Sequence, residues 1–174
     1  MIALYIVGGI ILIFLLVAAV IGTGWSFEKT ILLKSSLDKV WSQVSTLHAI
    51  NTWNPWLERD PKIQQQYSGE DGLPGASYAW TSDVKDVGVG NQTIVSVSNR
   101  VELATRINFI KPFKSTGLGY INVAPEGGAI RVSWKIVSSF PYPMNIMKLF
   151  GVMEKNLERD FGSGLNKLKA LCEK

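Results

Sequence analysis

An uncharged apolar run at the amino terminus constrains this chain more than any other feature. The first charged side chain is Glu28, and residues 2–21 contain nothing more polar than Tyr5. A helix of about 20 residues rises about 30 Å, the thickness of a bilayer's hydrocarbon core. Helices of soluble domains are usually apolar on one stripe only, whereas this run is apolar all round. It therefore predicts a transmembrane anchor over residues 1–24.

A cleaved secretory signal is the alternative interpretation, because residues 22–24 are small. No Lys or Arg precedes the run, and its length exceeds the ~7–15 apolar residues of a signal, which favours an uncleaved anchor. Lys29, Lys34 and Lys39 follow within about 20 residues, so the positive-inside rule favours a cytoplasmic domain. The sequence thus predicts a single-pass protein of the cell membrane.

The rest of the chain has the size of one domain, which we expect over residues 27–174. The net charge of +4 is spread along the chain, so nucleic acid is not an expected partner. The lone Cys172 excludes an internal disulfide and a cysteine-rich metal site, and the lone His48 excludes a histidine cluster. We expect no metal and no cofactor. His48 lies in a short helical stretch, where a surface or capping role is favoured over catalysis.

The domain begins with a strand and two short helices. Residues 27–33 have β character, and Ser35 and Ser36 are good N-cap residues for the helix that follows. A second short helix, residues 47–53, ends before Pro55 because proline cannot continue it.

Short strands separated by turn residues follow from residue 63. In residues 101–109 and 130–137 apolar and polar side chains alternate, which predicts an antiparallel sheet with one buried face. The expected inward residues are Val101, Leu103, Thr105, Ile107 and Phe109, with Ile130, Val132, Trp134 and Ile136. The expected strands are residues 77–82, 93–97, 101–109, 117–123 and 130–137. In total we expect about six antiparallel strands after the first strand, residues 27–33.

The last segment predicts one long amphipathic helix that starts after Pro143 and covers the sheet. Its apolar residues recur every three or four positions from Ile146 to Leu171. Gly162 and Gly164 interrupt it, at a bend or at a close approach to the sheet. The fold class is therefore α+β, with a cavity where sheet and helices diverge.

Four features occur together in this sequence: the order of elements, Val40 with Trp41, the run Trp53-Asn54-Pro55-Trp56, and Asp60-Pro61. As a set they resemble the SRPBCC superfamily, in its polyketide cyclase/dehydrase and lipid-transport-like branch. The likeness covers about residues 27–174. Further motifs of that branch are Gly75 with Tyr78 and Trp80, Gly88-Val89-Gly90, Phe109 to Phe113, Val132-Ser133-Trp134, and Phe161 to Leu165 with Leu168-Lys169. The resemblance implies the helix-grip fold and a hydrophobic pocket between sheet and long helix, without implying one reaction.

The first functional hypothesis is a membrane-tethered, non-enzymatic binding protein for a lipid-like or polyketide-like small molecule. Ligand pockets are mostly apolar with a few polar groups. The candidate cavity residues are Trp53, Trp56, Tyr78, Trp80, Trp134, Phe150, Met153 and Leu157.

Two alternatives remain open. A polyketide cyclase or dehydratase needs a titratable group on the buried face, and Tyr78 is the one plausible proton donor, so no catalytic residue is assigned. A membrane-anchored protein-interaction module could use the sheet or the long helix, although Glu154, Lys155 and residues 158–160 are expected to form a solvated helix face.

Overall fold

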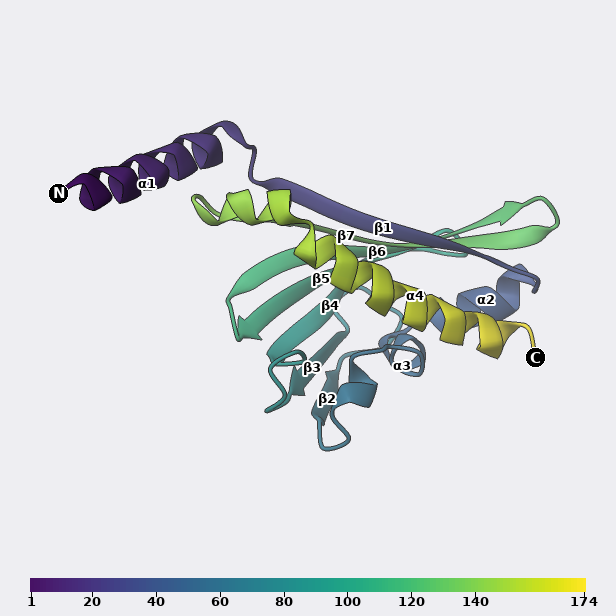
Figure 1. The fold of residues 1–174 in the computed structure, drawn as a ribbon. Helices are drawn as coiled ribbons and strands as arrows, with labels where there is room; N and C mark the ends of the chain where they lie inside the picture. Colours follow the sequence, from purple (N-terminus) through teal and green to yellow (C-terminus); the bar gives the residue numbers. More distant parts are fainter.

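The structure, a computed structural model, describes the backbone of residues 1–174 and the side chains of all of them except Ala3. Seven strands form one antiparallel sheet in the order β1-β7-β6-β5-β4-β3-β2, and the long helix α4 lies across it (Figure 1). The strands are β1 (Gly24–Leu33), β2 (Gln64–Ser68), β3 (Ser77–Thr81), β4 (Val89–Ser98), β5 (Glu102–Lys111), β6 (Ser115–Glu126) and β7 (Ala129–Ser139). The helices are α1 (Ile2–Val20), α2 (Leu37–Val44), α3 (Leu47–Asn51), η1 (Leu57–Arg59), η2 (Met144–Phe150) and α4 (Val152–Cys172). The predicted α+β helix-grip architecture is confirmed.

Side-chain caps fix the two short helices between β1 and β2. Ser36 caps α2 by accepting a hydrogen bond from the Lys39 amide at 3.3 Å, and Thr46 caps α3 by accepting from the Ala49 amide at 3.1 Å. The Ser35 hydroxyl instead donates to the Cys172 carbonyl at 2.9 Å. Ser35 therefore ties the end of β1 to the last turn of α4.

The inner face of the sheet follows the predicted alternation, with one exception at a turn. Leu103 and Thr105 are buried on β5, and Val132 is buried on β7. Val101, expected on the buried face, is 55 % exposed. Val101 lies before β5, in the turn that follows Arg100. Arg100 has a φ of 59°, and the chain reverses there instead of continuing as a strand, so the alternation does not include Val101.

The predicted single C-terminal helix is two segments. Residues 144–150 form the 3₁₀ helix η2, and Gly151 adopts a left-handed conformation (φ 61°, ψ 12°) before α4 begins. Because the chain changes direction there, the apolar series does not share one face: Phe161 and Leu168 are buried, whereas Phe150 is 64 % exposed.

Gly164 lies where α4 packs closely against the sheet. A Cβ on Gly164 would lie 3.0 Å from the Trp134 ring and 3.2 Å from Pro55, whereas one on Gly162 would meet the Lys29 side chain. Gly164 thus gives the helix room to pack against Trp134, and this is the close approach anticipated for the glycine pair.

The predicted transmembrane anchor is not supported. Within the part of the chain that the structure describes, no helix is both long and apolar enough to cross a membrane. The helix α1 ends at Val20, since Ile21 is extended (φ −76°, ψ 121°), so the helix is shorter than the apolar run 2–21.

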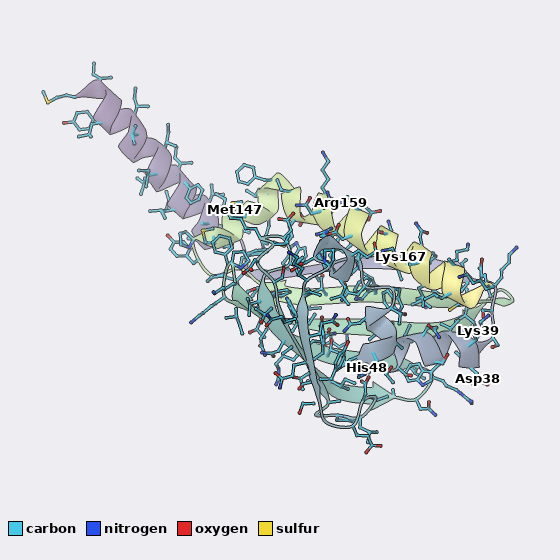
Figure 2. The ribbon with its side chains drawn as sticks, turned by 90° about the horizontal axis from the view of Figure 1, so that it is seen from below. Asp38, Lys39, His48, Met147, Arg159 and Lys167 are labelled. Atoms are coloured by element: carbon cyan, nitrogen blue, oxygen red, sulfur yellow. The ribbon has the colours of Figure 1, made fainter. Side chains whose placement is uncertain are left out.

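The segment η2 holds the C-terminal end of α1. Asn145 is 1 % exposed, and its Nδ2 atom donates to the carbonyls of Ala18 at 2.7 Å and Ile21 at 2.6 Å. The Lys148 ammonium donates to the carbonyls of Gly22 and, at 3.0 Å, Gly24. Met147 lies beside this joint in Figure 2. Since helix-terminal carbonyls lack partners within the helix, these side chains fix how α1 leaves the domain (Figure 1).

Candidate functional site

A cavity of about 150 Å³ lies between the inner face of the sheet and α4. An empty apolar cavity of about this volume takes one benzene-sized ring. Its wall is mainly aliphatic and aromatic, with side chains from η1, β3 to β7 and α4. Six aromatic residues line it: Trp56, Tyr78, Trp80, Phe109, Trp134 and Phe161.

Trp134 on β7 holds one side of the aromatic wall together. Its ring stacks on Phe161 of α4, with centroids 4.0 Å apart, and meets Trp56 edge to face at 5.8 Å. Trp53 meets Trp134 from behind at 5.0 Å. Trp53 is fully buried, and its indole N–H donates to the Gln43 carbonyl at 2.9 Å. Trp53 therefore supports the cavity wall without lining the cavity.

Trp80 on β3 forms the opposite side, and a glycine makes room for it. Its indole N–H donates to the Val87 carbonyl at 3.1 Å, and a Cβ on Gly90 would lie 2.5 Å from the indole ring. Only a residue without a side chain fits beneath the ring. The run Gly88-Val89-Gly90, singled out in the sequence, leads into β4, and its Gly90 leaves room for Trp80 in the wall.

Three polar residues that line the cavity, Tyr78, Gln92 and Thr105, come from β3, β4 and β5. Tyr78 is 2 % exposed, and its hydroxyl has no hydrogen-bond partner among the described residues. Burial raises the pKa of the Tyr78 phenol well above its usual value, with a further contribution from Tyr67. The Gln92 amide donates to the Thr105 hydroxyl at 2.9 Å, and that hydroxyl donates to the Gly119 carbonyl at 3.3 Å. Tyr78 is therefore a protonated donor with unused capacity.

The structure brings together five of the eight predicted cavity residues: Trp56, Tyr78, Trp80, Trp134 and Leu157 line the cavity. Trp53 lies behind it, as described above. Phe150 and Met153 do not line it, because the left-handed turn at Gly151 places them on the outside, 64 % and 41 % exposed. Met153 instead borders a second hollow of about 180 Å³ with Trp25 and Lys148.

Sequence reasoning missed Asn54, Gln92, Asp86 and Phe161 as lining residues. Gln92 was missed because the expected strand began at residue 93, whereas β4 begins at Val89. Extending the alternation backward from Ile94 would have placed Gln92 on the inner face. Lys135 also borders the cavity, but its ammonium lies 3.8 Å from the Glu28 carboxylate on the outer face.

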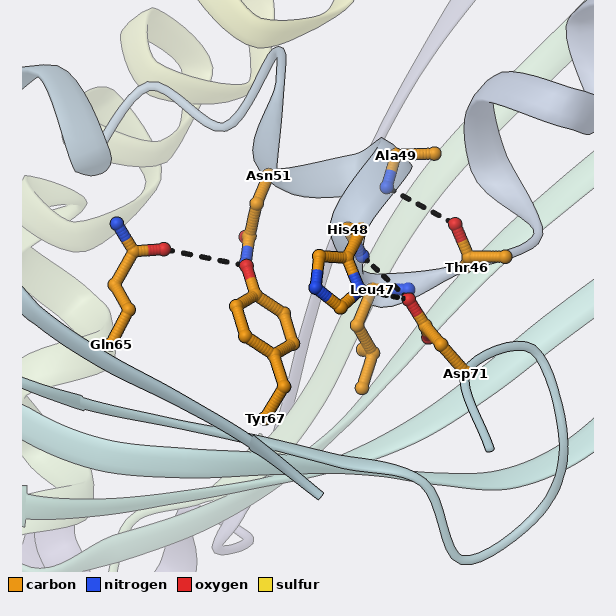
Figure 3. A network of polar contacts seen from close by, with 8 residues as sticks. All are labelled: Thr46, Leu47, His48, Ala49, Asn51, Gln65, Tyr67 and Asp71. Carbon is orange, nitrogen blue, oxygen red and sulfur yellow. Dashed lines mark hydrogen bonds and ion pairs between the residues drawn. The ribbon is translucent and has the colours of Figure 1, made fainter. Parts of the chain in front are cut away.

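The single histidine belongs to a surface network around α3 (Figure 3). The Asp71 carboxylate accepts the backbone N–H groups of Leu47 at 2.7 Å and His48 at 2.9 Å, and it lies 2.6 Å from His48 Nδ1. The His48 ring stacks on Tyr67 with centroids 3.7 Å apart. Partial burial raises the pKa of Asp71, but the hydrogen bonds from His48 and Leu47 outweigh it, so the net pKa is lowered. The hydrogen bonds to Asp71 therefore cap the amino-terminal end of α3.

The expected solvated face of α4 is partly committed to internal contacts. Asp160 is 5 % exposed and pairs with Arg59 of η1, so the expectation was wrong for this residue. Glu158 pairs with Lys29 of β1, and Glu154 accepts a hydrogen bond from the Trp25 indole at 2.6 Å. These carboxylates anchor α4 over the sheet.

Several solved structures have a fold similar to that of this chain. A protein from Chromobacterium violaceum matches with 13 % identity and a TM-score of 0.60, covering 86 % of this chain and 97 % of that one. A protein from Nitrosospira multiformis matches with 18 % identity and a TM-score of 0.60, covering 85 % and 96 %. The di-domain ARO/CYC protein StfQ of the steffimycin biosynthetic pathway matches with 10 % identity and a TM-score of 0.63, covering 86 % of this chain and 51 % of StfQ. At these identities the likeness is one of fold.

No curated protein sequence matches this chain. The family model described as polyketide cyclase / dehydrase and lipid transport matches residues 24–173, nearly the whole of the chain beyond α1. The chain therefore belongs to the polyketide cyclase/dehydrase and lipid transport family, within the SRPBCC superfamily.

Proposed function

We propose that this protein binds an apolar small molecule in the cavity between the sheet and α4, without transforming it. The observation that carries the proposal is the cavity itself: a wall of aromatic and aliphatic side chains around about 150 Å³ of free volume. Pockets for small molecules combine a largely apolar wall with few polar groups. The family description, which includes lipid transport, supports the same class of ligand.

A cyclase or dehydratase activity is the second candidate, supported by the family description and by the fold shared with StfQ. General acid/base catalysis needs a group whose pKa is close to the working pH. The raised pKa of Tyr78 makes it a weaker proton donor, Asp86 is exposed, and Lys135 lies with Glu28 on the other face. These lining residues favour binding over acid/base chemistry.

Native mass spectrometry of the full chain, purified in detergent from a lipid-containing host, tests binding. We expect an apolar adduct on the wild-type protein. Ile107→Trp fills the cavity from β5 and is expected to remove the adduct, whereas Ile110→Trp on the same strand, outside the cavity and 44 % exposed, keeps it. A wild-type protein without adduct, or an adduct that survives Ile107→Trp, contradicts the proposal.

We further propose that α1 holds the domain at a lipid membrane, with the domain on the cytoplasmic side. Leu4, Ile10 and Leu16 point in directions about 120° apart around a helix of 3.6 residues per turn. They are 77 %, 62 % and 58 % exposed, so α1 presents apolar side chains on every side. A helix of this kind favours an apolar surrounding over water. The hydrogen bond from Asn145 to the end of α1 holds that helix in a fixed direction relative to the domain, which supports the tether.

Extraction of cell membranes with alkaline carbonate tests the tether. We expect the full chain to stay in the pellet, and a doubly substituted Ile10→Lys, Leu16→Lys protein to be released. Leu73→Lys, at a 49 % exposed loop residue of the domain, is the control and should behave as wild type. Release of the wild-type protein contradicts the tether. A reporter fused after Lys174 that is active only outside the cytoplasm contradicts the orientation.

A further inference from the structure

One end of the sheet, the end from which α1 leaves the domain, carries two connecting segments. Gly24, the first residue of β1, pairs with Ser139, the last residue of β7, and the start of β6 also pairs with the end of β7. The turn of residues 112–114 joins the end of β5 to the start of β6. This turn and residues 140–150, which follow β7 and include η2, therefore lie at the same end of the sheet as α1 (Figure 1).

Large apolar side chains are exposed on both segments. Phe113 in the β5–β6 turn is 82 % exposed, and η2 with the residues before it adds five more side chains. We call this set the apolar end surface: Phe113, Tyr142, Met144, Met147, Leu149 and Phe150. At the opposite end of the sheet, the exposed residues Leu32, Leu73 and Val101 belong to three separate segments. Isolated exposed apolar residues are ordinary, whereas a gathered set marks an interaction site.

The charges within the apolar end surface are positive. Lys111 and Lys114 flank Phe113, and Lys148 lies in η2. Neither the β5–β6 turn nor the segment 140–150 contains an acidic residue. Lysines beside exposed apolar side chains are complementary to an anionic lipid surface, which offers phosphate groups above an apolar layer.

The next loop along the same end of the sheet limits this surface. The β3–β4 loop exposes Asp83 and Asp86 against one lysine, Lys85. In the strand order it lies beyond the β5–β6 turn, farther from α1. An anionic surface repels this loop, so the contact is confined to the two segments next to α1.

We propose that the apolar end surface docks on the headgroup layer of an anionic lipid membrane, with Phe113 and Phe150 inserted and the lysines facing lipid phosphates. This inference rests on the proposed attachment of α1 to a membrane and specifies how the domain sits there. Asn145 binds the end of α1 from within η2, so an α1 that enters the bilayer brings this surface to the headgroups. A second copy of the chain would present the same lysines, and like charges disfavour that partner.

Fluorescent labelling of the full chain in vesicles tests the docking. Phe113→Cys and Phe150→Cys proteins carry a nitrobenzoxadiazole label, and the vesicles combine phosphatidylcholine, phosphatidylserine and a lipid with a doxyl quencher high on its acyl chain. Leu73→Cys and Val101→Cys, exposed at the opposite end of the sheet, are the matched controls. The unsubstituted protein measures background labelling of the buried Cys172.

We expect the doxyl lipid to quench the labels of Phe113→Cys and Phe150→Cys at least about threefold more than the control labels, because interfacial segments lie about 5–10 Å deep. Adding Lys111→Glu and Lys114→Glu to Phe150→Cys should lower its quenching about twofold in vesicles with phosphatidylserine, and less in phosphatidylcholine alone. The two labelled positions belong to separate segments, so either one tests the surface if the other variant folds poorly.

Flotation of the same vesicles separates this inference from the attachment on which it rests. If the protein floats with the vesicles but all four labels are quenched equally, or none is, the docking is wrong and the attachment stands. If the labels on Phe113→Cys and Phe150→Cys become shielded in detergent as the protein concentration rises, yet stay unquenched in vesicles, the partner is a second copy and not lipid. If the protein does not float, the attachment fails together with the inference.

Discussion

The rings of Trp134 and Phe161 stack with centroids 4.0 Å apart and planes inclined by 14°. Trp134 belongs to β7 and Phe161 to α4, and both line the cavity. The same contact therefore joins helix to sheet and forms the cavity wall. Stability of the domain and shape of the site depend on one pair of side chains, with Gly164 leaving space for the approach.

Truncation of Phe161 should destabilise the domain and enlarge the cavity. Phe161 is 2 % exposed, and removal of a buried phenyl ring typically costs about 3–5 kcal/mol. We expect Phe161→Ala to lower the free energy of unfolding by about 3 kcal/mol in denaturant titrations. Phe150→Ala is the matched control, since Phe150 is 64 % exposed and should change the value by less than about 0.5 kcal/mol. Equal losses for the two variants would contradict the assigned packing.

A methyl group at Gly90 should displace Trp80 from the cavity wall. The added Cβ would lie 2.5 Å from the indole and 2.6 Å from the Asn108 carbonyl, so backbone or ring must move. We expect Gly90→Ala to destabilise by about 1–3 kcal/mol. Gly24→Ala in β1 meets nothing within 4 Å and should be close to neutral. Thermal unfolding of both variants measures the difference, and a stable Gly90→Ala protein would argue against this position of Trp80.

Loss of the Asn145 amide should loosen the joint between α1 and the domain. Asn145→Ala leaves the carbonyls of Ala18 and Ile21 without this donor. We expect faster backbone hydrogen exchange in residues 17–24, with little change in the sheet, when the full chain is measured in detergent. Leu149→Ala in the same segment η2 is the control, because Leu149 is 62 % exposed. Exchange unchanged from wild type would mean that Asn145 does not hold the joint.

The Asp71 cap should contribute stability that disappears in acid. Its folded-state pKa is lowered, because hydrogen bonds from His48 and Leu47 outweigh desolvation. The contribution is therefore fully present above the unfolded-state pKa of about 4 and is lost as the pH falls through the lower folded-state value. We expect Asp71→Asn to melt at a lower temperature than wild type at pH 7, by the equivalent of about 1 kcal/mol, with the gap narrowing below pH 4. A gap that is constant with pH would contradict a charged cap.

The sequence alone determined the α+β fold class and the order of strands and helices, because short-range patterns encode them. Alternation in residues 103–109 and 130–137 defined the inner face, and Ser36 marked the start of the first short helix. These features depend on which residue follows which along a strand or helix. The choice of Tyr78, Trp80 and Trp134 as cavity candidates also relied on the pocket that the family resemblance implies.

The tertiary structure decided which of the other candidates share a site. Phe150 and Met153 fit the helical repeat, but the positive φ of Gly151 turns them outward, and periodicity does not specify such a break. Tyr78 and Gln92 are 14 residues apart, and only the register of β3 with β4 places them side by side. Which polar atoms remain unpaired depends on contacts across strands, and these contacts exist only in the folded chain.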